Sequence, residues 1–302
     1  MLNTPMGALV VVVVFVVGNA FVFFVFYLPR TSAPISASVL VGAGDIADCA
    51  SSGDQATAKL LDDVSGTVYT LGDNAYESGA PSEFSECYDP TWGRHKDRTS
   101  PSLGNHDYYT PEASGYFDYF GPAAGDPKKG YYSYDLGEWH VVVLNSQCKH
   151  HVGGCEAHSP MVNWLEQDLA SNPKPCTLAY WHDPLFSSGY HGNNARMKPT
   201  WEALYAADAE VVLNGHDHDY ERFAPQSPRG AADDARGIRQ FVVGTGGREL
   251  RPFRPAIEAN SEVRNANTFG VLKLTLHPNS YEWKFIPVAG KTLTDSGTSE
   301  CH

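Results

Sequence analysis

Apolar and polar positions form blocks of two kinds along this chain. Short apolar runs recur from about residue 38 onward and predict buried strands at 38–43, 67–71, 139–145, 177–181, 210–213 and 240–243. Longer mixed stretches predict helices at 54–63, 160–170 and 200–207. Two further runs, 269–276 and 281–286, are expected to form a closing hairpin around a turn at 277–280. Strands that alternate with helices predict an α/β sandwich.

One part of the chain interrupts this alternation. Residues 222–267 are rich in Pro, Arg, Ala and Gly and contain a single expected strand. Long segments without regular structure are uncommon in compact domains and often belong to functional sites. We therefore expect a long surface excursion here that could border a binding site.

The N-terminal segment differs from everything that follows it. No charged side chain occurs between Leu2 and Pro29, and residues 6–28 are nearly all Val, Phe, Ala and Leu. The segment is long enough to cross the hydrocarbon core of a membrane, which takes about 20 apolar residues. Three interpretations stay open: a signal peptide cleaved near Ala33 or near Ser36, an uncleaved membrane anchor, and a buried strand.

We favour export of everything that follows about residue 35. Residues 1–35 are then a signal peptide or a membrane anchor, with residues 6–28 available for membrane attachment, and residues 36–302 form the catalytic domain. The charge of the chain bears on its binding partners. The 302 residues include 22 Lys and Arg and 35 Asp and Glu, which gives a net charge of −13. An acidic surface repels phosphate backbones, which argues against a general nucleic-acid binder.

Export would place six cysteines in an oxidising compartment, where we expect them to be paired. Cys148 and Cys155 close a short glycine-containing loop and are the most favourable local pair. Fifteen connectivities are open to six cysteines, so the remaining pairs stay hypotheses. The set we prefer is completed by Cys49 with Cys87 and Cys176 with Cys301. A metal cluster of cysteines is the alternative, but the sequence has no C-x-x-C pair to support it.

Polar side chains follow several of the expected strands directly. In open α/β sheets, ligands bind beyond the carboxyl ends of the strands. A single Gly-Asp or Gly-Asn pair is an ordinary turn, but a series of five strand ends with metal-competent side chains is hard to assign to turns. These side chains belong to Asp45, Asp73, Asn105, His106, His182, His216 and His218.

The chemistry of these side chains favours a metal site. Carboxylates, an amide oxygen and imidazoles together suit zinc, manganese or iron and do not suit calcium. They are too many for one tetrahedral zinc ion. Two ions about 3.5–4 Å apart that share a bridging carboxylate would use them all.

These blocks resemble the five motifs of the calcineurin-like metallophosphoesterases, over roughly residues 38–287. Tyr76, three residues after Asp73, is similar to the purple acid phosphatases within that superfamily, in particular to their small single-domain forms. The resemblance implies a metallophosphoesterase β-sandwich of two mixed sheets flanked by helices, preceded here by the apolar N-terminal segment. The blocks are Gly44-Asp45, Gly72-Asp73-Asn74-Ala75-Tyr76, Gly104-Asn105-His106-Asp107, His182 and Gly215-His216-Asp217-His218.

The resemblance also implies two metal sites that share Asp73 as a bridge. The first, for ferric iron in the purple members, would be made by Asp45, Asp73, Tyr76 and His218. The second, for divalent zinc, manganese or iron, would be made by Asp73, Asn105, His182 and His216. Two catalytic histidines are implied as well: His106 would contact the phosphate or the attacking oxygen, and His191 would face the leaving group. A surface loop histidine is the competing interpretation of His191.

The function implied is that of a dinuclear-metal phosphatase. It would hydrolyse small-molecule phosphate monoesters by attack of a metal-activated hydroxide, with acid phosphatase activity. A phosphodiesterase or nucleotide hydrolase that uses the same two metals is the alternative. A surface protein whose catalysis is lost would usually lack ligands, and all seven are present here.

The roles of two further groups of side chains near these blocks stay undecided at the level of sequence. Arg248, Arg251 and Arg254 could bind a substrate phosphate, but we expect a solvated basic patch. The pairs Tyr108-Tyr109 and Tyr131-Tyr132 could line a pocket, but we expect half-buried loop aromatics.

Overall fold

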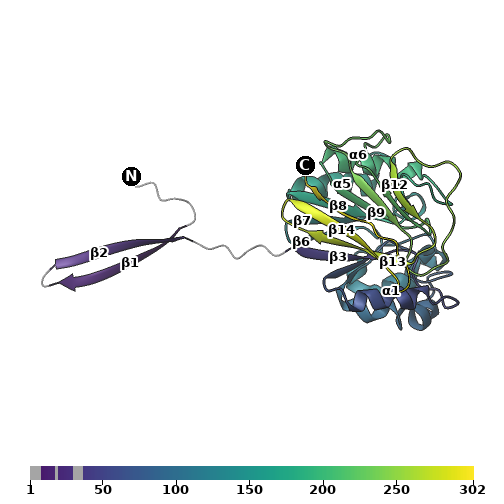
Figure 1. Cartoon of the computed structure of the whole chain (residues 1–302), viewed down its shortest axis with the longest axis horizontal. Coiled ribbons are helices and arrows are strands. Elements are labelled where there is room, and N and C mark those ends of the chain that lie inside the picture. Colours follow the sequence, from purple (N-terminus) through teal and green to yellow (C-terminus); the bar gives the residue numbers. More distant parts are fainter. Residues whose placement is uncertain (1–7, 18–19, 30–36) are drawn as a thin grey trace. The chain divides into compact units, whose positions relative to one another are not determined.

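The computed structural model describes residues 8–17, 20–29 and 37–302 (Figure 1). The chain divides into two compact units, Met1–Ser36 and Ala37–His302. The cleavage positions considered above, Ala33 and Ser36, lie outside the described residues.

The described part of the first unit is a β-hairpin. Strands β1 (Ala8–Val17) and β2 (Ala20–Pro29) pair antiparallel with Ala8 opposite Pro29. Their Val and Phe residues suit an extended backbone, because β-branched and aromatic side chains favour strands. No helix among the described residues has the length and hydropathy needed to cross a membrane. The role of this segment as a signal peptide or an anchor stays a prediction.

The second unit contains a six-stranded sheet with the strand order β15-β14-β13-β3-β4-β5. Strands β3, β4 and β5 run parallel, whereas β13, β14 and β15 are joined antiparallel, and β13 pairs antiparallel with β3. The sheet is therefore mixed. Its strands are β3 (Ser38–Ala43), β4 (Thr67–Thr70), β5 (Thr99–Ser100), β13 (Gly270–Leu276), β14 (Ser280–Pro287) and β15 (Ser296–Glu300).

The other sheet has seven strands in the order β12-β10-β11-β9-β8-β7-β6. Its central strands β7, β8, β9 and β11 are parallel, and antiparallel partners extend it at both edges. The strands are β6 (Tyr132–Leu136), β7 (Trp139–Val143), β8 (Cys176–Tyr180), β9 (Val211–Asn214), β10 (Tyr220–Phe223), β11 (Arg239–Val243) and β12 (Ser261–Asn265).

Alternating side chains of the seven-stranded sheet fill two separate cores. Val141 and Val143 join the core between the two sheets, which also holds Leu40 and Leu272 of the other sheet. Val142 points to the opposite face and packs in a second core with side chains of α5 (Pro160–Ser171) and α6 (Lys198–Ala206). Side chains in a strand alternate between faces, so a continuous apolar run serves both cores.

Helices flank both sheets, and the predicted sandwich of two mixed sheets is confirmed. In Figure 1, α5 and α6 lie on one side of the sheets and α1 (Gly53–Asp62) lies on the other, near β13. These three helices match the predicted ones to within two residues at each end. The sequence patterns did not predict the short helices between β4 and β8, which are α2 (Pro81–Glu83), α3 (Ser114–Phe120) and α4 (Cys148–His151).

The predicted excursion over residues 222–267 is wrong in its strand content. Besides β11, the region holds the end of β10 and the whole of β12, so it completes one edge of the seven-stranded sheet. Strand β12 reads Ser-Glu-Val-Arg-Asn, and none of its residues is buried. An edge strand with one solvated face carries this many polar residues, and its sequence therefore resembles a loop.

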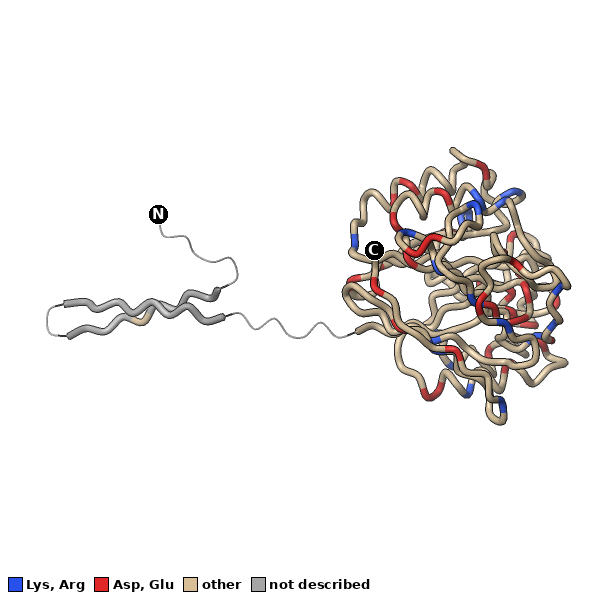
Figure 2. The backbone as a smooth tube through the Cα atoms, turned by 45° about the horizontal axis from the view of Figure 1, so that its top comes forward, with Lys and Arg blue, Asp and Glu red and all other residues tan. Residues whose placement is uncertain are grey.

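Three disulfides cross-link the second unit. They pair Cys49 with Cys87, Cys148 with Cys155 and Cys176 with Cys301. The preferred connectivity is confirmed. In the view of Figure 2, Asp and Glu are spread across this unit with Lys and Arg among them, so the excess negative charge is distributed and not collected in one stretch of chain.

Candidate metal centre

The candidate site lies where the carboxyl ends of parallel strands from both sheets meet. Asp45 and Asp73 follow β3 and β4 of the six-stranded sheet. His182 and His216 follow β8 and β9 of the seven-stranded sheet. The two-sheet arrangement therefore explains why residues so far apart in sequence lie close together. Each sheet contributes some of the side chains that could bind metal.

Three of these residues hold the left-handed backbone conformation, which is uncommon outside glycine. The φ angles are 58° at Asp45, 49° at Asp73 and 71° at His216. The conformation is held by contacts between the loops: the backbone N–H of Asp45 donates to Gly72 O at 3.1 Å, and that of His216 donates to Asp45 Oδ2 at 2.9 Å. Strained backbone of this kind clusters at functional sites, where it aims side chains.

The first predicted donor group comes together around the phenol of Tyr76. Its Oη lies 2.9 Å from Asp45 Oδ1 and 3.3 Å from His218 Nε2. The same oxygen lies 3.0 Å from Asp73 Oδ2. Asp45 Oδ1 and His218 Nε2 are 3.3 Å apart. Four predicted ligands thus present their donor atoms to one small space.

The second predicted donor group comes together around His182. Its Nε2 lies 3.1 Å from Asn105 Oδ1 and 3.2 Å from His216 Nδ1. It also lies 3.2 Å from Asp73 Oδ2, the same atom that contacts Tyr76. Asp73 Oδ2 therefore touches both groups, and Asp45, Asp73 and His182 offer three buried ligand atoms within 4.8 Å of one another.

Outer hydrogen bonds orient two of the imidazoles with one nitrogen toward this space. His182 Nδ1 lies 2.6 Å from Leu71 O, and His218 Nδ1 lies 2.7 Å from Glu249 O. A carbonyl oxygen can only accept, so each Nδ1 carries a proton, and in the neutral ring Nε2 keeps a free lone pair. Metal-binding histidines are oriented by outer partners in this way.

Burial and neighbouring charges shift the pKa values of the acidic groups in this site. Burial raises the pKa of Asp73, but His182 and His106 lower it, and the net direction is down. Burial, together with Asp45 and Asp73, raises the pKa of Tyr76 well above its ordinary value. A phenolate at Tyr76 therefore requires a cation among these oxygens. Carboxylate, phenol, amide and imidazole donors suit iron, zinc or manganese, so the residues present fit the implied metals.

The residues of the site differ in their exposure to solvent. Asp45, Asp73, Tyr76, His182 and His218 are buried. Asn105, His106 and His216 are half-buried, and His191 is exposed. A ligand in solution therefore approaches from the side of the second donor group.

The two predicted catalytic histidines lie on this more exposed side. His106 Nε2 is 4.0 Å from Asp73 Oδ2, and its Nδ1 is 2.6 Å from Glu77 O. The ring centroid of His191 is 4.3 Å from that of His216 and 6.5 Å from that of His218. The structure thus brings His191 to the site from the loop that follows β8, although it does not test the role of either histidine.

Arg248 and Arg251 contact the site, so the predicted solvated patch is wrong. Arg251 Nη1 donates to His191 Nε2 at 2.9 Å. Arg248 is paired with Asp48 at 2.6 Å, and its guanidinium carbon lies 4.7 Å from the centroid of the Tyr76 ring. Tertiary contacts between loops decide this, and nothing in the local sequence shows them.

The tyrosine pairs also differ from one another in burial. Tyr131 is buried, and Tyr108 and Tyr132 are half-buried. Tyr109 is 62% exposed, so the expectation of half-buried aromatics is wrong both for this residue and for buried Tyr131.

Two buried aspartates that the sequence analysis did not single out support the site. Asp217 lies between His216 and His218, and its carboxylate accepts hydrogen bonds from the loop that carries His191. Asp183 Oδ1 lies 3.7 Å from His216 Nε2, the nitrogen that points away from His182. Their positions next to ligand histidines are the only signal that could have indicated them.

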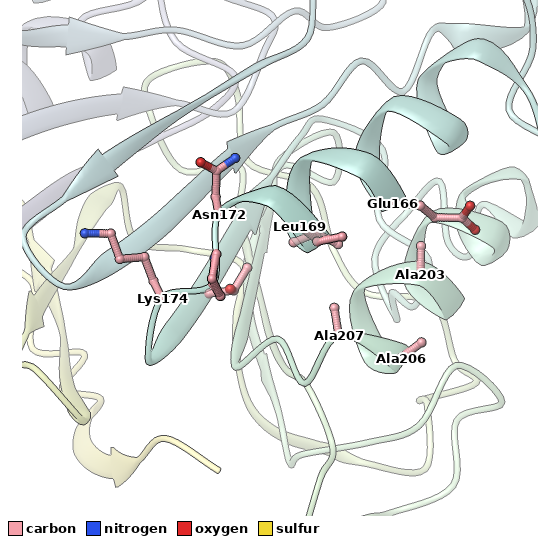
Figure 3. Close-up of a pocket in the computed structure, with 10 residues that line it drawn as sticks. Glu166, Leu169, Asn172, Lys174, Ala203, Ala206 and Ala207 are labelled. Atoms are coloured by element: carbon pink, nitrogen blue, oxygen red, sulfur yellow. The ribbon is translucent and has the colours of Figure 1, made fainter.

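A separate cavity of about 570 Å³ lies between α5 and α6 (Figure 3). Leu169 and Ala203 line it together with Lys174 and Thr177, which lie before β8 and at its amino end. None of the predicted site residues lines this cavity, and it is distinct from the donor cluster at the carboxyl end of β8.

Comparisons with known proteins agree with this geometry. The chain is 33% identical over 123 residues to purple acid phosphatase 21 of Arabidopsis thaliana, which is 39% of this chain and 26% of that protein. It is 30% identical over 105 residues to purple acid phosphatase 15 of the same plant, which is 33% of this chain and 19% of that protein. The chain therefore spans about a quarter or less of the length of these curated relatives.

Solved structures show the same fold at low identity. A purple acid phosphatase from yellow lupin (Lupinus luteus) seeds matches with a TM-score of 0.73 at 18% identity, over 93% of this chain and 57% of that one. GAP50, the anchor in the inner membrane complex of Plasmodium, matches with a TM-score of 0.69 at 12% identity, over 88% and 90%. The sequence model of the calcineurin-like phosphoesterases matches residues 39–220, more than half of the chain. The chain belongs to the calcineurin-like phosphoesterase family.

Proposed function

We propose that this chain is an exported dinuclear-metal phosphatase that hydrolyses phosphate monoesters. The observation that carries the proposal is the position of Asp73 Oδ2, which touches Tyr76 Oη at 3.0 Å and His182 Nε2 at 3.2 Å. One carboxylate oxygen shared by two donor groups is what a bridged pair of cations needs.

The two donor groups divide the metals between them. Asp45, Tyr76 and His218, with the bridging Asp73, would hold ferric iron, because a phenol oxygen and a carboxylate are hard anionic donors. The second group, which shares Asp73, would hold divalent zinc, manganese or iron through Asn105, His182 and His216. Two cations there would supply charge neutralisation at the phosphoryl oxygens and an acidified water as nucleophile.

The chain's own residues would bind and orient the ester. The site opens beside Asn105, His106 and His216, so the phosphoryl group enters there. Glu77 O fixes the ring of His106 through Nδ1 at 2.6 Å, and Nε2 lies 4.0 Å from Asp73 Oδ2, where it can contact a phosphoryl oxygen. His191, held by Arg251, would stand on the leaving-group side.

Three disulfides support the export part of the proposal, since they form and persist in oxidising compartments. The acid phosphatase assignment depends on Tyr76, because a phenolate stabilises the ferric state, and a ferric ion acidifies water more strongly than a divalent one. A purely divalent pair would predict a more neutral optimum.

The test combines an absorption spectrum, a metal count and two substrates. Protein purified without chelators is expected to hold two metals per chain including iron, with a broad visible band that Tyr76→Phe removes. It is expected to hydrolyse an aryl monophosphate much faster than the corresponding bis-ester. A colourless protein with two divalent ions and the reverse preference would contradict the monoesterase and support a diesterase at the same site.

A further inference from the structure

Few large hydrophobic side chains of this protein are strongly exposed. Among the residues whose exposure the structure describes, they are Tyr109 at 62%, Tyr190 at 60% and Ile257 at 43%. Most other aromatic side chains pack in the two cores. Exposed aromatic rings that gather at one place on a surface mark a binding site more often than isolated ones do.

The two tyrosines stand beside the two predicted catalytic histidines. The ring centroid of Tyr109 is 4.7 Å from that of His106, and the ring centroid of Tyr190 is 5.2 Å from that of His191. Both histidines border the more exposed side of the metal centre, whereas the ligands behind them are buried. The two most exposed rings therefore flank the entrance through which a substrate must pass.

Each ring is held in place by its backbone and not by its hydroxyl group. Tyr109 ends the short helix Asp107–Tyr109, and its N–H donates to His106 O at 3.1 Å. Tyr190 lies in the loop that Asp217 fixes, and the guanidinium carbon of Arg251 lies 5.5 Å from the centroid of its ring. Neither tyrosine hydroxyl makes a hydrogen bond to another described residue. The backbone of each tyrosine is thus fixed, while much of its side chain stays exposed to solvent.

We infer that Tyr109 and Tyr190 are specificity-determining residues that stack on a planar aromatic group of the ester. This inference rests on the proposed function and narrows its substrate class. Aromatic side chains stack on any planar ring and tolerate differences in ring chemistry. The class is therefore that of monoesters with an aromatic ring, either attached directly, as in aryl phosphates, or carried on a sugar, as in nucleoside monophosphates.

The test compares two pairs of substrates that differ in the ring, and the members of the first pair also share the type of bond that breaks. A nucleoside 5′-monophosphate and ribose 5-phosphate both release a primary alkoxide, so their intrinsic reactivities match. We expect kcat/KM to be higher for the nucleotide, and Tyr109→Leu or Tyr190→Leu to reduce that preference by on the order of tenfold. Phenyl phosphate and glycerol phosphate form the second pair. Their leaving groups differ, so the ratio of their kcat/KM values in each variant is compared with the same ratio in the unchanged protein.

The matched controls are Tyr109→Phe and Tyr190→Phe, which keep the rings and remove the hydroxyl groups. They are expected to retain the preference, which separates stacking from hydrogen bonding and from a general loss of structure. A change confined to the nucleotide pair supports a base carried on a sugar, and a change confined to phenyl phosphate supports a ring next to phosphorus.

Two results would overturn the inference in distinguishable ways. If the unchanged protein hydrolyses all four esters and the Leu variants alter neither ratio, the tyrosines do not select the substrate, while the phosphatase stands. If the metal-loaded protein hydrolyses none of them, the proposed function fails and the inference fails with it.

Discussion

The backbone N–H of His191 donates a hydrogen bond of 2.6 Å to the carboxylate of Asp217. Asp217 is fully buried between His216 and His218, and its other oxygen accepts hydrogen bonds from Ser187 Oγ and from the N–H of Gly192. One carboxylate therefore ties the loop that carries His191 to the turn that carries two predicted metal ligands.

The first prediction concerns this tie. Asp217→Asn keeps the shape of the side chain but replaces one acceptor oxygen with a donor that faces N–H groups. We expect kcat to fall about tenfold, as the loss of one charged hydrogen bond would produce, with two metals retained. The loss should be larger for alkyl than for aryl esters, because the oxygen released from an alkyl ester needs more stabilisation from His191.

Ser187→Ala provides the control, since it removes one of the three hydrogen bonds to Asp217 and leaves its charge. It should produce a smaller loss with the same dependence on the leaving group. A loss of metal from the Asp217→Asn protein would show that Asp217 acts on the ligands beside it and not on His191.

The second prediction separates the bridging ligand from a terminal one. Asp73→Asn should lower the occupancy of both metals, because Asp73 Oδ2 touches both donor groups. Asn105→Ala should lower the metal count from two to one, because Asn105 contacts only His182 among the predicted ligands. Both variants should lose more than about a hundredfold in kcat, since outer partners of ligands alone cost 10–100-fold. Equal metal loss in the two variants would contradict a bridge.

The third prediction concerns the close approach of Gly104 to Asp73. A Cβ at Gly104 would overlap with Asp73 Oδ1 and with the backbone nitrogen of the same residue. Gly104→Ala should therefore displace Asp73, lower the metal content and cost about 1–3 kcal/mol of stability. Metal analysis and denaturant unfolding test this expectation, and an alanine variant with two metals and full activity would show that the neighbouring loop yields at little cost.

Much of this site could be predicted from the sequence because four of the predicted ligands closely follow strands. Asp45, Asp73, His182 and His216 stand at the ends of short apolar runs, and parallel strands bring such ends to one edge. The α/β class follows from the same alternation of strands and helices, whereas the two mixed sheets were implied by the resemblance to the metallophosphoesterases.

The remaining features depend on contacts that no local pattern encodes. The pairing of Arg251 with His191 joins two loops from different sheet connections, and the exposure of Tyr109 depends on what its neighbours cover. Edge strand β12 is polar enough to resemble a loop, so periodicity could not identify it. Local sequence therefore predicts the ligands, whereas tertiary packing determines what surrounds them.

The fourth prediction compares two disulfides of different span. Cys176 and Cys301 are 125 residues apart and tie β8 to the chain after β15, whereas Cys148 and Cys155 are separated by 7 residues. By loop-closure entropy in the unfolded chain, replacing the long-range pair with alanines should cost about 5 kcal/mol and the short-range pair about 2 kcal/mol. Denaturant unfolding measures both. Equal costs would show that local packing around the sulfurs, and not loop length, sets their contribution.

The last prediction concerns Glu210, a buried carboxyl group far from the metal centre. Burial raises its pKa to about 8, although the backbone N–H of His302 donates to Oε1 at 3.0 Å and opposes the shift. In the unfolded chain the group ionises near its ordinary pKa of about 4.3. Between these values the unfolded state releases the proton and the folded state keeps it, so raising the pH destabilises the fold until about pH 8.

Glu210→Gln removes this penalty and keeps an oxygen that can accept from His302. The variant should be on the order of 5 kcal/mol more stable than the unchanged protein at pH 8, and the difference should vanish toward pH 4. Thermal unfolding of both proteins across this range, with metals present, measures the effect. His302 Nδ1 lies 2.7 Å from Glu210 Oε2, so an ionised pair is the competing possibility. In that case the glutamine variant would be less stable than the unchanged protein at neutral pH, because it loses the ion pair. The sign of the stability difference at pH 7 therefore decides between a protonated Glu210 and an ionised pair.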